Sequence, residues 1–407
     1  MKTRYCLFAL MLLSGAAAVG CDVLSNGMEG KEPQPIELTK SQQVVLDRGN
    51  DFAFNLLRET YAEAGGGNLF LSPMGVAIVS SMLANGAGGE TYDEIVAAIG
   101  MEGCSLDQIN ACYSTMLSGL KKADPTVSLS LANSIWVAQD LGLRKQFSSN
   151  MDKVFDAESF SVAFGSPQTL NKVNAWCSKK TSGLIPKMFD RLDARIRMLL
   201  INALYFKGAW THVFPEADTK EDDFRTLSGQ TVKMPFMMLM QESLDIYQDK
   251  AVSLVKMPYG NGAFYMEAIL PSGDFKAFIE NLSLDEVNLW DASAAKDKVK
   301  LRFPKFSAEF DTDEMLMPVL RRLGMKRAFS FDADFSNMSD ELLYVSKFRQ
   351  KAYVSIDEKG TEAAAVTVAE LRKNGSMETL ISFDRPFVYL IRESSTGAIL
   401  FIGTKVK

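Results

Sequence analysis

The amino-acid sequence predicts an α+β fold, and three observations lead to that prediction. Apolar residues with helical spacing dominate the first half of the chain, whereas alternating and β-branched segments dominate the second. The two kinds of segment do not follow one another as repeated strand–helix–strand units, which disfavours a parallel α/β sheet. The 407 residues, 47% of them hydrophobic, can bury a large core in one domain or in two.

The first twenty residues form a secretory signal peptide. An apolar run from Phe8 to Leu13 is too short to span a membrane and is followed by small residues. The end of this segment, Ala18-Val19-Gly20-Cys21, resembles a bacterial lipobox, in which Cys21 is lipidated. An ordinary signal-peptidase site stays open as the alternative, because leucine is more typical than Ala18 at that position.

Residues 21–40 are expected to be a lipidated N-terminus and a flexible tether, since glycine and proline are scattered among polar residues there. The lipid would make the membrane a partner and would hold the protein in the bacterial cell envelope, at the outer membrane or the cell surface. The folded domain is predicted to span residues 41–407.

Two helices are predicted at the start of this domain. The apolar residues between Val44 and Leu57 have helical spacing, and the glycines at 65–67 end that helix. A second, buried helix is expected after Ser72, with Ser72 as its cap and Pro73 in its first turn. Strands are expected where residues alternate or are β-branched, at 127–137, 198–206, 252–257, 264–270 and 299–303.

The charge and residue inventory argues against several functions. The formal net charge is −6 and no lysine-rich or arginine-rich run occurs, so we expect no nucleic-acid partner. His212 is the only histidine, so any catalytic triad would have to use it, and a thiol dyad would have to pair it with Cys177. Residues 332–336 are similar to a calcium loop but lack its later glycine and glutamate. We therefore expect no enzyme activity, no metal and no cofactor.

The mature chain carries three cysteines besides Cys21. Cys104 and Cys112 could pair in an oxidising envelope, but an odd number is a poor disulfide framework. Buried free thiols at Cys104, Cys112 and Cys177 are the expected state.

The most informative segment lies near the C-terminus and begins at Asp357. In an extended conformation its odd positions share one face, and none of them is charged. Such a segment can join a sheet as an additional strand, whereas a buried unpaired charge would oppose that by several kcal/mol. An Ala-rich amphipathic helix or a solvated linker is the competing interpretation. The uncharged positions are Thr361, Ala363, Ala365, Thr367, Ala369 and Leu371.

This segment resembles the hinge of the serpin reactive-centre loop. Further blocks in family order include Asn68–Pro73, Val173–Trp176, Thr181–Ile185, Asn202–Trp210 and Pro386–Phe387 with Ile399–Gly403. The resemblance runs from about Asn50 to Lys407. It implies a serpin fold, with a large central sheet of five strands, two smaller sheets, eight or nine helices and an exposed reactive-centre loop at about 358–382. The implied hinge consists of Glu358, Gly360, Thr361, Glu362, Ala363, Ala364 and Ala365.

The resemblance also implies residues that control how the central sheet opens. Glu358 and Lys305 match positions that form an ion pair above Trp210, and Ser72 and Asn202 match hydrogen-bonding positions beneath the opening. Two residues depart from the family pattern: Gly75 stands where serine is usual, and Gln350 where histidine is usual. We therefore expect the polar contacts there to be fewer or differently arranged.

The cleaved bond is expected within Lys373, Asn374 and Gly375. Family spacing from Gly360 favours the bond after Asn374, whereas a trypsin-like peptidase would favour the bond after Lys373. The resemblance implies a monomeric suicide inhibitor of serine endopeptidases, with cysteine endopeptidases as a further target class and the peptidase as covalent partner. A non-inhibitory binding or carrier protein on the same scaffold is the alternative.

Overall fold

A computed structural model describes residues 32–361 and 379–407 of the chain. The predicted signal peptide, Cys21 and the residues up to 31 lie outside the described part, as do residues 362–378. All described residues belong to one compact unit that runs from Lys31 to Lys407.

Residues Gln34 and Ile36, within the predicted tether, contact the folded domain. The backbone N–H of Gln34 donates to the carbonyl of Ala123 (3.1 Å), and the N–H of Ile36 donates to Ser395 Oγ (2.8 Å). Ile36 is buried because it packs on Gly119, where an added Cβ would lie 2.8 Å from its side chain. Residues before 41 therefore pack on the folded domain, because the side chain of Ile36 occupies the space that Gly119 leaves open.

The described residues form nine α-helices, in agreement with the predicted number. The first helix begins at Lys40 after a capping box between Thr39 and Gln42, and it ends before the predicted glycines. The second begins at Pro73, and Ser72 Oγ accepts from the N–H of Gly75, as expected for a cap. The helices are α1 Lys40–Glu63, α2 Pro73–Ala84, α3 Gly89–Ala98, α4 Leu106–Leu120, α5 Lys145–Phe155, α6 Pro167–Lys180, α7 Phe275–Asn281, α8 Leu284–Ser293 and α9 Leu316–Arg322.

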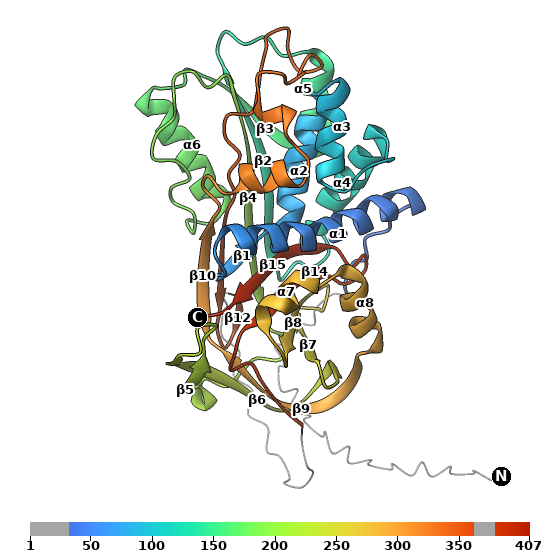
Figure 1. Ribbon diagram of the computed structural model, residues 1–407, viewed down its shortest axis with the longest axis vertical. Coiled ribbons are helices and arrows are strands. Elements are labelled where there is room, and N and C mark those ends of the chain that lie inside the picture. The colour runs from blue at the N-terminus through green and yellow to red at the C-terminus, as the bar shows by residue number, and fades with distance from the viewer. Residues whose placement is uncertain (1–31, 362–378) are drawn as a thin grey trace, which may run out of the picture. The chain divides into compact units, whose positions relative to one another are not determined.

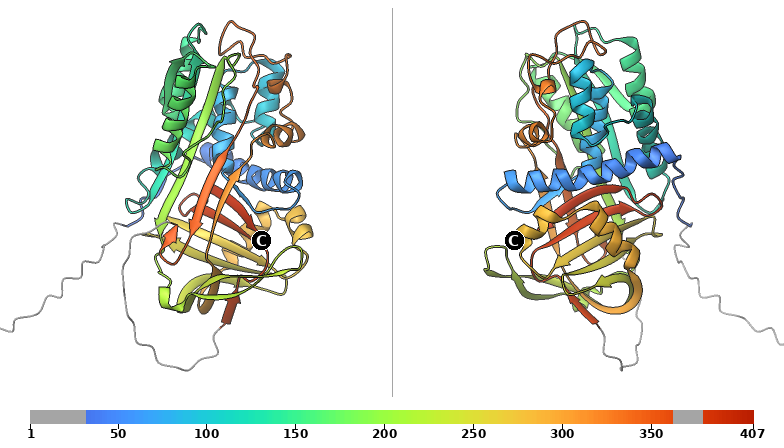
Figure 2. Two further views of the ribbon diagram at one scale, coloured as in Figure 1. Left: turned by 90° about the vertical axis from the view of Figure 1, so that its left-hand side faces the viewer. Right: turned by 45° about the vertical axis from the view of Figure 1, so that its right-hand side comes forward.

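Five strands form the expected central sheet, but the sheet is open in its middle. The strands β3 (Ala157–Val162), β2 (Ser128–Ala138) and β4 (Met198–Ala209) pair in that order, and β10 (Phe306–Asp311) pairs with β11 (Lys351–Ile356). Figure 2 shows the long, light-green β4 running beside the orange strands. Within the described residues, β4 and β11 share no ladder, and only β12 (Gly360–Thr361) pairs with the free edge of β4.

The two smaller sheets of the expected fold are continuous with each other. The strand β6 (Thr231–Gln248) has 18 residues and belongs to both, with an irregularity between Leu239 and Glu242. The strand order is β1-β15-β14-β8-β7-β6-β9-β13, and β5 pairs with β6. The other bounds are β1 Leu69–Leu71, β5 Lys220–Arg225, β7 Val252–Tyr259, β8 Phe264–Pro271, β9 Ala295–Pro304, β13 Thr379–Ser382, β14 Phe387–Glu393 and β15 Ile399–Lys405.

The buried core lies between these sheets and the helices (Figure 1). Every residue of β8, β14 and β15 is buried, which explains their nearly continuous apolar sequences. The helix α2 is buried along its whole length and touches both β4 and β15. The helix α2 therefore forms the floor beneath the open part of the central sheet.

Candidate functional site

The segment that enters the undescribed loop, Asp357 to Thr361, is fixed at the head of the open sheet. We refer to it as the entering stem. Glu358 is 7% exposed, and its carboxylate accepts from Lys305 Nζ (2.7 Å) and Thr219 Oγ1 (2.8 Å). Burial raises the pKa of Glu358, but these hydrogen bonds outweigh burial and hold the pKa below its usual range. The ion pair that the resemblance implies is therefore present.

Trp210, the residue directly after β4, supports the entering stem. Its indole Nε1 donates to the carbonyl of Asp357 (2.9 Å), and its backbone N–H donates to the carbonyl of Lys359 (2.8 Å). The indole is buried and stacks on Tyr259 with a centroid separation of 4.3 Å. The position expected beneath the ion pair thus holds the stem by two hydrogen bonds.

Gly360 begins the pairing with β4 because no other residue fits there. It pairs with Ala209 and has φ +142°, a conformation that L side chains rarely adopt. A Cβ at this position would lie 2.2 Å from the carbonyl oxygen of Gly208. The glycine therefore permits both the turn and the close approach of the two strands.

Thr361 is the last described residue of the hinge, and its side chain faces the core. It pairs with Gly208, is 2% exposed, and its hydroxyl is 2.9 Å from the hydroxyl of Tyr259. The uncharged face predicted for the odd positions thus begins on the inner side of the sheet. The hinge residues Glu362, Ala363, Ala364 and Ala365 lie outside the described residues.

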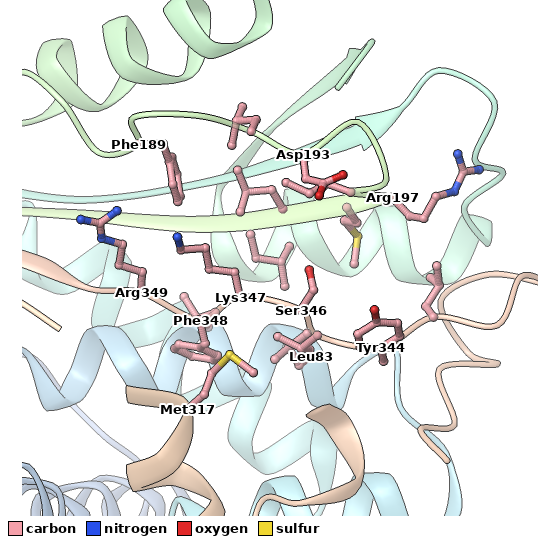
Figure 3. Close-up of a pocket in the computed structure, with 18 of the residues that line it drawn as sticks. Leu83, Phe189, Asp193, Arg197, Met317, Tyr344, Ser346, Lys347, Phe348 and Arg349 are labelled. Carbon is pink, nitrogen blue, oxygen red and sulfur yellow. The ribbon is translucent and has the colours of Figure 1, made fainter. Parts of the chain in front are cut away.

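A cavity of about 950 Å³ lies farther along β4, beside the part of the strand that begins at Met198 and away from the entering stem. On one side it is lined by Met198, Leu200 and Asn202, and on the other by the segment 342–350, which leads into β11. Figure 3 shows Lys347 and Arg349 pointing towards the β4 side, whereas Phe348 points the other way, towards Met317. This alternation is typical of an extended segment. The cavity therefore separates two strand-like edges, as a gap for a further strand would.

The floor of the cavity carries the polar residues expected to control opening. Gln350 holds both backbone groups of Ser72: its Oε1 accepts from the N–H (2.8 Å) and its Nε2 donates to the carbonyl (2.9 Å). Ser72 Oγ donates to the carbonyl of Leu400 (2.7 Å). Gln350 thus ties α2 to the edge of the sheet by an amide pair that does not titrate, unlike the usual histidine.

Asn202 is only half satisfied. Its Nδ2 donates to Asn133 Oδ1 (2.8 Å), but its Oδ1 is buried and has no hydrogen-bond partner within the described part of the chain. A Cβ on Gly75 would lie 2.4 Å from this oxygen, so a serine there would displace the amide. Gly75 therefore makes room for Asn202, and an unpaired acceptor is left at the edge of the gap.

The segment that leaves the loop, β13 with Phe383 and Asp384, is the second stem. We refer to it as the leaving stem. It pairs in parallel with β9 at the edge of the sheet that contains β6, and Leu380 is 56% exposed. Arg302 fastens it: Nε donates to Ser382 Oγ (2.7 Å) and Nη2 to Asp384 Oδ2 (3.0 Å), while Nη1 binds Asp222. One guanidinium therefore joins three strands.

The structure disfavours the catalytic alternatives that the sequence left open. Burial raises the pKa of Cys177 to about 12, so its thiol is not ionised near neutral pH. His212 Nδ1 lies 3.2 Å from Glu242 Oε2.

Cys104, Cys112 and Cys177 are free thiols, and the described ranges hold no group of side chains suited to a metal. No helix in the described ranges is long and apolar enough to cross a membrane.

Sequence reasoning found one half of the site more fully than the other. It identified the pair Glu358 and Lys305, the pair Ser72 and Gln350, and also Trp210 and Asn202. It missed Tyr259, Thr219 and Arg302. The bonds of these residues join positions between 80 and 139 residues apart, and no local pattern marks them. Lys373, Asn374 and Gly375 lie outside the described residues, so their role stays a prediction.

The fold and the two stems define a class of protein: a domain with an open sheet that holds a loop at the head of the opening. The family described as Serpin (serine protease inhibitor) matches residues 47–407. The chain therefore belongs to the serpin family, whose members are in general inhibitors of proteases rather than enzymes.

Individual relatives agree with this assignment. The chain is 29% identical over 408 residues to alpha-1-antitrypsin 1-3 of Mus musculus, with 98% of each chain covered. Among solved structures, the thermophilic serpin tengpin in its native state matches with a TM-score of 0.83 and 29% identity over 93% of this chain and 97% of that one. Human thyroxine-binding globulin matches with a TM-score of 0.82 and 28% identity over 90% and 99% of the two chains.

Proposed function

We propose that this chain is a suicide inhibitor of serine endopeptidases, with cysteine endopeptidases as a further target class. The peptidase nucleophile bonds to the carbonyl carbon of a loop residue and the peptide bond breaks, its nitrogen leaving as a protonated amine. The acyl-enzyme is then held because the severed loop enters the central sheet. The observation that carries the proposal is the pairing of Gly360 and Thr361 with one end of β4, whose other end lines a cavity.

The observed register sets how far the loop would extend along β4. Thr361 pairs with Gly208, so a continued antiparallel ladder would pair residue 371, ten residues on, with Met198, ten residues back. Met198 is the first residue of β4. Lys373 to Gly375 would then lie just beyond the end of the ladder, which agrees with cleavage there. The bond after Asn374 stays the favoured one, with the bond after Lys373 as the alternative.

A continued ladder in the same register would bring a partner to the unpaired Oδ1 of Asn202. Thr367 follows Thr361 by six residues and would lie opposite Asn202, six residues before Gly208. Side chains directly opposite each other in a sheet are about 5 Å apart or closer. We propose that the Thr367 hydroxyl donates to Asn202 Oδ1 in the inserted state. Insertion would thereby remove the penalty of a buried unsatisfied acceptor.

The energy of insertion is large enough to make the intact form a kinetically held state. About a dozen backbone hydrogen bonds at ~0.5–1.5 kcal/mol each, with apolar burial, give on the order of 10–20 kcal/mol before the entropy of ordering. Loop insertion is a known form of strand addition and a known release of stored strain.

The carrier alternative rests on the similarity to thyroxine-binding globulin, whose structure contains thyroxine. A carrier that traps no peptidase needs no uncharged hinge. Because Thr361 is uncharged and already paired in the core, and the next odd positions are small, we favour the inhibitor.

The test exposes the protein to a panel of trypsin, elastase, subtilisin and papain. We expect a complex with at least one of them that resists denaturant on a gel, and a loop fragment whose mass ends within residues 373–375. The variant Lys373→Ala should abolish trapping of trypsin but leave elastase trapping within about twofold if the bond after Asn374 is used. Loop cleavage by every peptidase without any complex would contradict the proposal.

We further propose that Cys21 carries lipid and anchors the domain to the cell envelope, with the predicted tether, residues 21–40, between the lipid and the domain. This rests on the resemblance of Ala18-Val19-Gly20-Cys21 to a lipobox. Membrane fractionation of cells expressing the protein tests it. Wild-type protein should partition with membranes and Cys21→Ser should release it; a soluble wild-type protein that begins at residue 19 or 22 would contradict the lipid.

A further inference from the structure

The cavity between β4 and the segment 342–350 is apolar on its inner side. Val79 and Leu83 of the buried helix α2 line it, and both side chains are themselves buried. Phe348, which points away from β4 towards Met317, is buried as well (Figure 3). This side of the cavity therefore offers hydrocarbon, and not hydrogen-bonding groups, to a molecule that enters from outside.

Exposed apolar side chains stand at the mouth of the cavity. Leu342 and Tyr344 line the cavity and are 95% and 46% exposed. Phe331 is 89% exposed, and its ring centroid lies 5.0 Å from that of Tyr344. We refer to Phe331, Leu342 and Tyr344 as the apolar lip. A group of large apolar side chains at such exposure is typical of a binding surface.

Positive charge faces the other side of the cavity. Figure 3 shows Lys347 and Arg349 pointing towards β4, and the guanidinium of Arg349 forms an ion pair with Asp311. Lys347 is exposed and makes no ion pair with any described residue; its Nζ lies 5.7 Å from the ring centroid of Phe189. An ammonium is therefore available for an anion at the edge of the apolar layer.

The charges around the cavity favour an anion over a cation. Of the described side chains that line it, six are basic, and only Asp193, Asp313 and Glu314 are acidic. Two of these carboxylates already face a guanidinium: Asp193 pairs with Arg195 (2.6 Å), and Asp313 lies 3.6 Å from Arg349. The whole chain has a formal net charge of −6, so the positive lining is a local feature.

Size and chemistry together indicate an amphiphile. The volume of about 950 Å³ falls within the range of small-molecule sites, about 300–1,000 Å³. A small inorganic anion would leave the apolar inner side facing water, and a neutral hydrocarbon would cover the Lys347 ammonium without a counter-charge. A flexible hydrocarbon chain with one carboxylate matches both sides, and the apolar lip gives such a chain a path into the cavity.

We infer that this cavity binds an amphiphilic anion of the fatty-acid class, with its chain between α2 and Phe348 and its carboxylate at Lys347. The bound chain would occupy the space beside β4 that the severed loop needs. The ligand would therefore slow insertion and turn the inhibitor into a substrate that the peptidase cuts and releases. The effect on trapping rests on the proposed function, whereas the binding of the ligand does not.

The binding test titrates the full-length protein with laurate by calorimetry, below the concentration at which laurate forms micelles. Butyrate has the same head group on a short chain, and dodecyltrimethylammonium has a chain of the same length on a cation. We expect laurate to bind at least tenfold more tightly than either, because the site requires both the chain and the negative charge.

Three variants locate the bound laurate. Lys347→Glu should weaken laurate binding at least tenfold, and Leu342→Ser in the apolar lip about threefold; both residues are exposed, so the melting temperature should stay within about 2 °C of wild type. Lys122→Glu is the matched control, because Lys122 is an exposed lysine that does not line the cavity. The control should keep the wild-type affinity. No measurable binding of laurate, or equal affinity in wild type, Lys347→Glu and Lys122→Glu, would overturn the site. Equal binding of dodecyltrimethylammonium would overturn it too.

The test of regulation uses a peptidase that the protein traps. Saturating laurate should raise the number of inhibitor molecules consumed per trapped peptidase at least threefold, and Lys347→Glu should need more than tenfold more laurate for the same rise. Laurate that binds at Lys347 but leaves this number unchanged would overturn the placement of the chain in the insertion space. If no peptidase is trapped even without laurate, the proposed function is wrong, and the titrations still decide whether the cavity binds the anion.

Discussion

The two stems of the loop differ in what holds them. The entering stem is held by shape and main-chain pairing: Gly360 fits where no side chain can, and Thr361 is buried at 2% exposure. The leaving stem also pairs through its main chain, with β9 at the edge of a sheet, but the charged guanidinium of Arg302 adds side-chain bonds to Ser382 and Asp384. The entering stem forms the start of a strand that could be extended along β4. The leaving stem is expected to stay paired with β9 after the loop is cut.

This difference predicts that substitution by arginine has a large effect at the entering stem and little effect at the leaving stem. Thr361→Arg should convert the inhibitor into a substrate, because arginine would have to be buried without a partner for insertion to begin. We expect the number of inhibitor molecules consumed per trapped peptidase to rise at least tenfold while loop cleavage persists. Leu380→Arg is the control at an exposed position of the leaving stem and should leave this number within about twofold. Unchanged stoichiometry in Thr361→Arg would refute strand insertion.

Gly360→Ala tests whether shape holds the entering stem. The added Cβ would lie 2.2 Å from a backbone oxygen, and the positive φ adds strain, so we expect a loss of about 3 kcal/mol or more. The melting temperature of the intact protein should fall by several degrees. Gly142→Ala is the matched control, because a Cβ there meets nothing within 4 Å. Equal melting temperatures for both variants would show that the observed pairing does not hold the stem.

Arg302→Met tests whether charge holds the leaving stem. The variant keeps the apolar contact with Phe236 but loses the bonds to Ser382 and Asp384. We expect the uncut loop to enter the gap on its own, so trapping activity should decay on the order of tenfold faster at 37 °C. Mass spectrometry must show an intact chain at the end of the decay. A decay rate equal to that of wild type would mean that the bonds of Arg302 to Ser382 and Asp384 do not hold β13 in place.

The smallest expected effect concerns pH at the entering stem. The pKa of Glu358 lies below its usual range in the folded protein, so its contribution to stability is present above the unfolded pKa and is lost as pH falls through the folded value. At pH 7, Glu358→Gln should cost about 1 kcal/mol. The difference in melting temperature between wild type and Glu358→Gln should shrink as pH falls below about 4. A difference that is constant from pH 7 to pH 3 would contradict the ion pair.

Much of the fold could be predicted because its determinants are local. The cap at Ser72, the extent of α1 and the strands at β7 and β8 follow from spacing and residue type within a few positions. The start of the ordered chain could not be predicted, since Ile36 is buried only because Gly119, distant in sequence, leaves room for it. No strand was predicted at β6, and strand propensity would in any case not show which sheets the strand joins.

The site divides in the same way. The hinge pattern from Thr361 onward is readable from alternation alone, and the resemblance supplied Glu358 and Lys305. The clip at Arg302 and the hydroxyl contact of Thr361 with Tyr259 depend on pairings between distant strands. The sequence pointed to Gly75 and Asn202 separately. Only the structure shows that the missing side chain of Gly75 leaves room for the amide of Asn202.

We propose that the gap beside β4 receives the loop once the loop is cut. The most direct test is calorimetry of the intact protein and of protein cut once within residues 362–378 by a peptidase that is not trapped. Insertion should add hydrogen bonds and burial to the sheet, so the cut protein should melt more than about 10 °C higher than the intact protein. Equal melting temperatures, or a lower one after cutting, would contradict the claim.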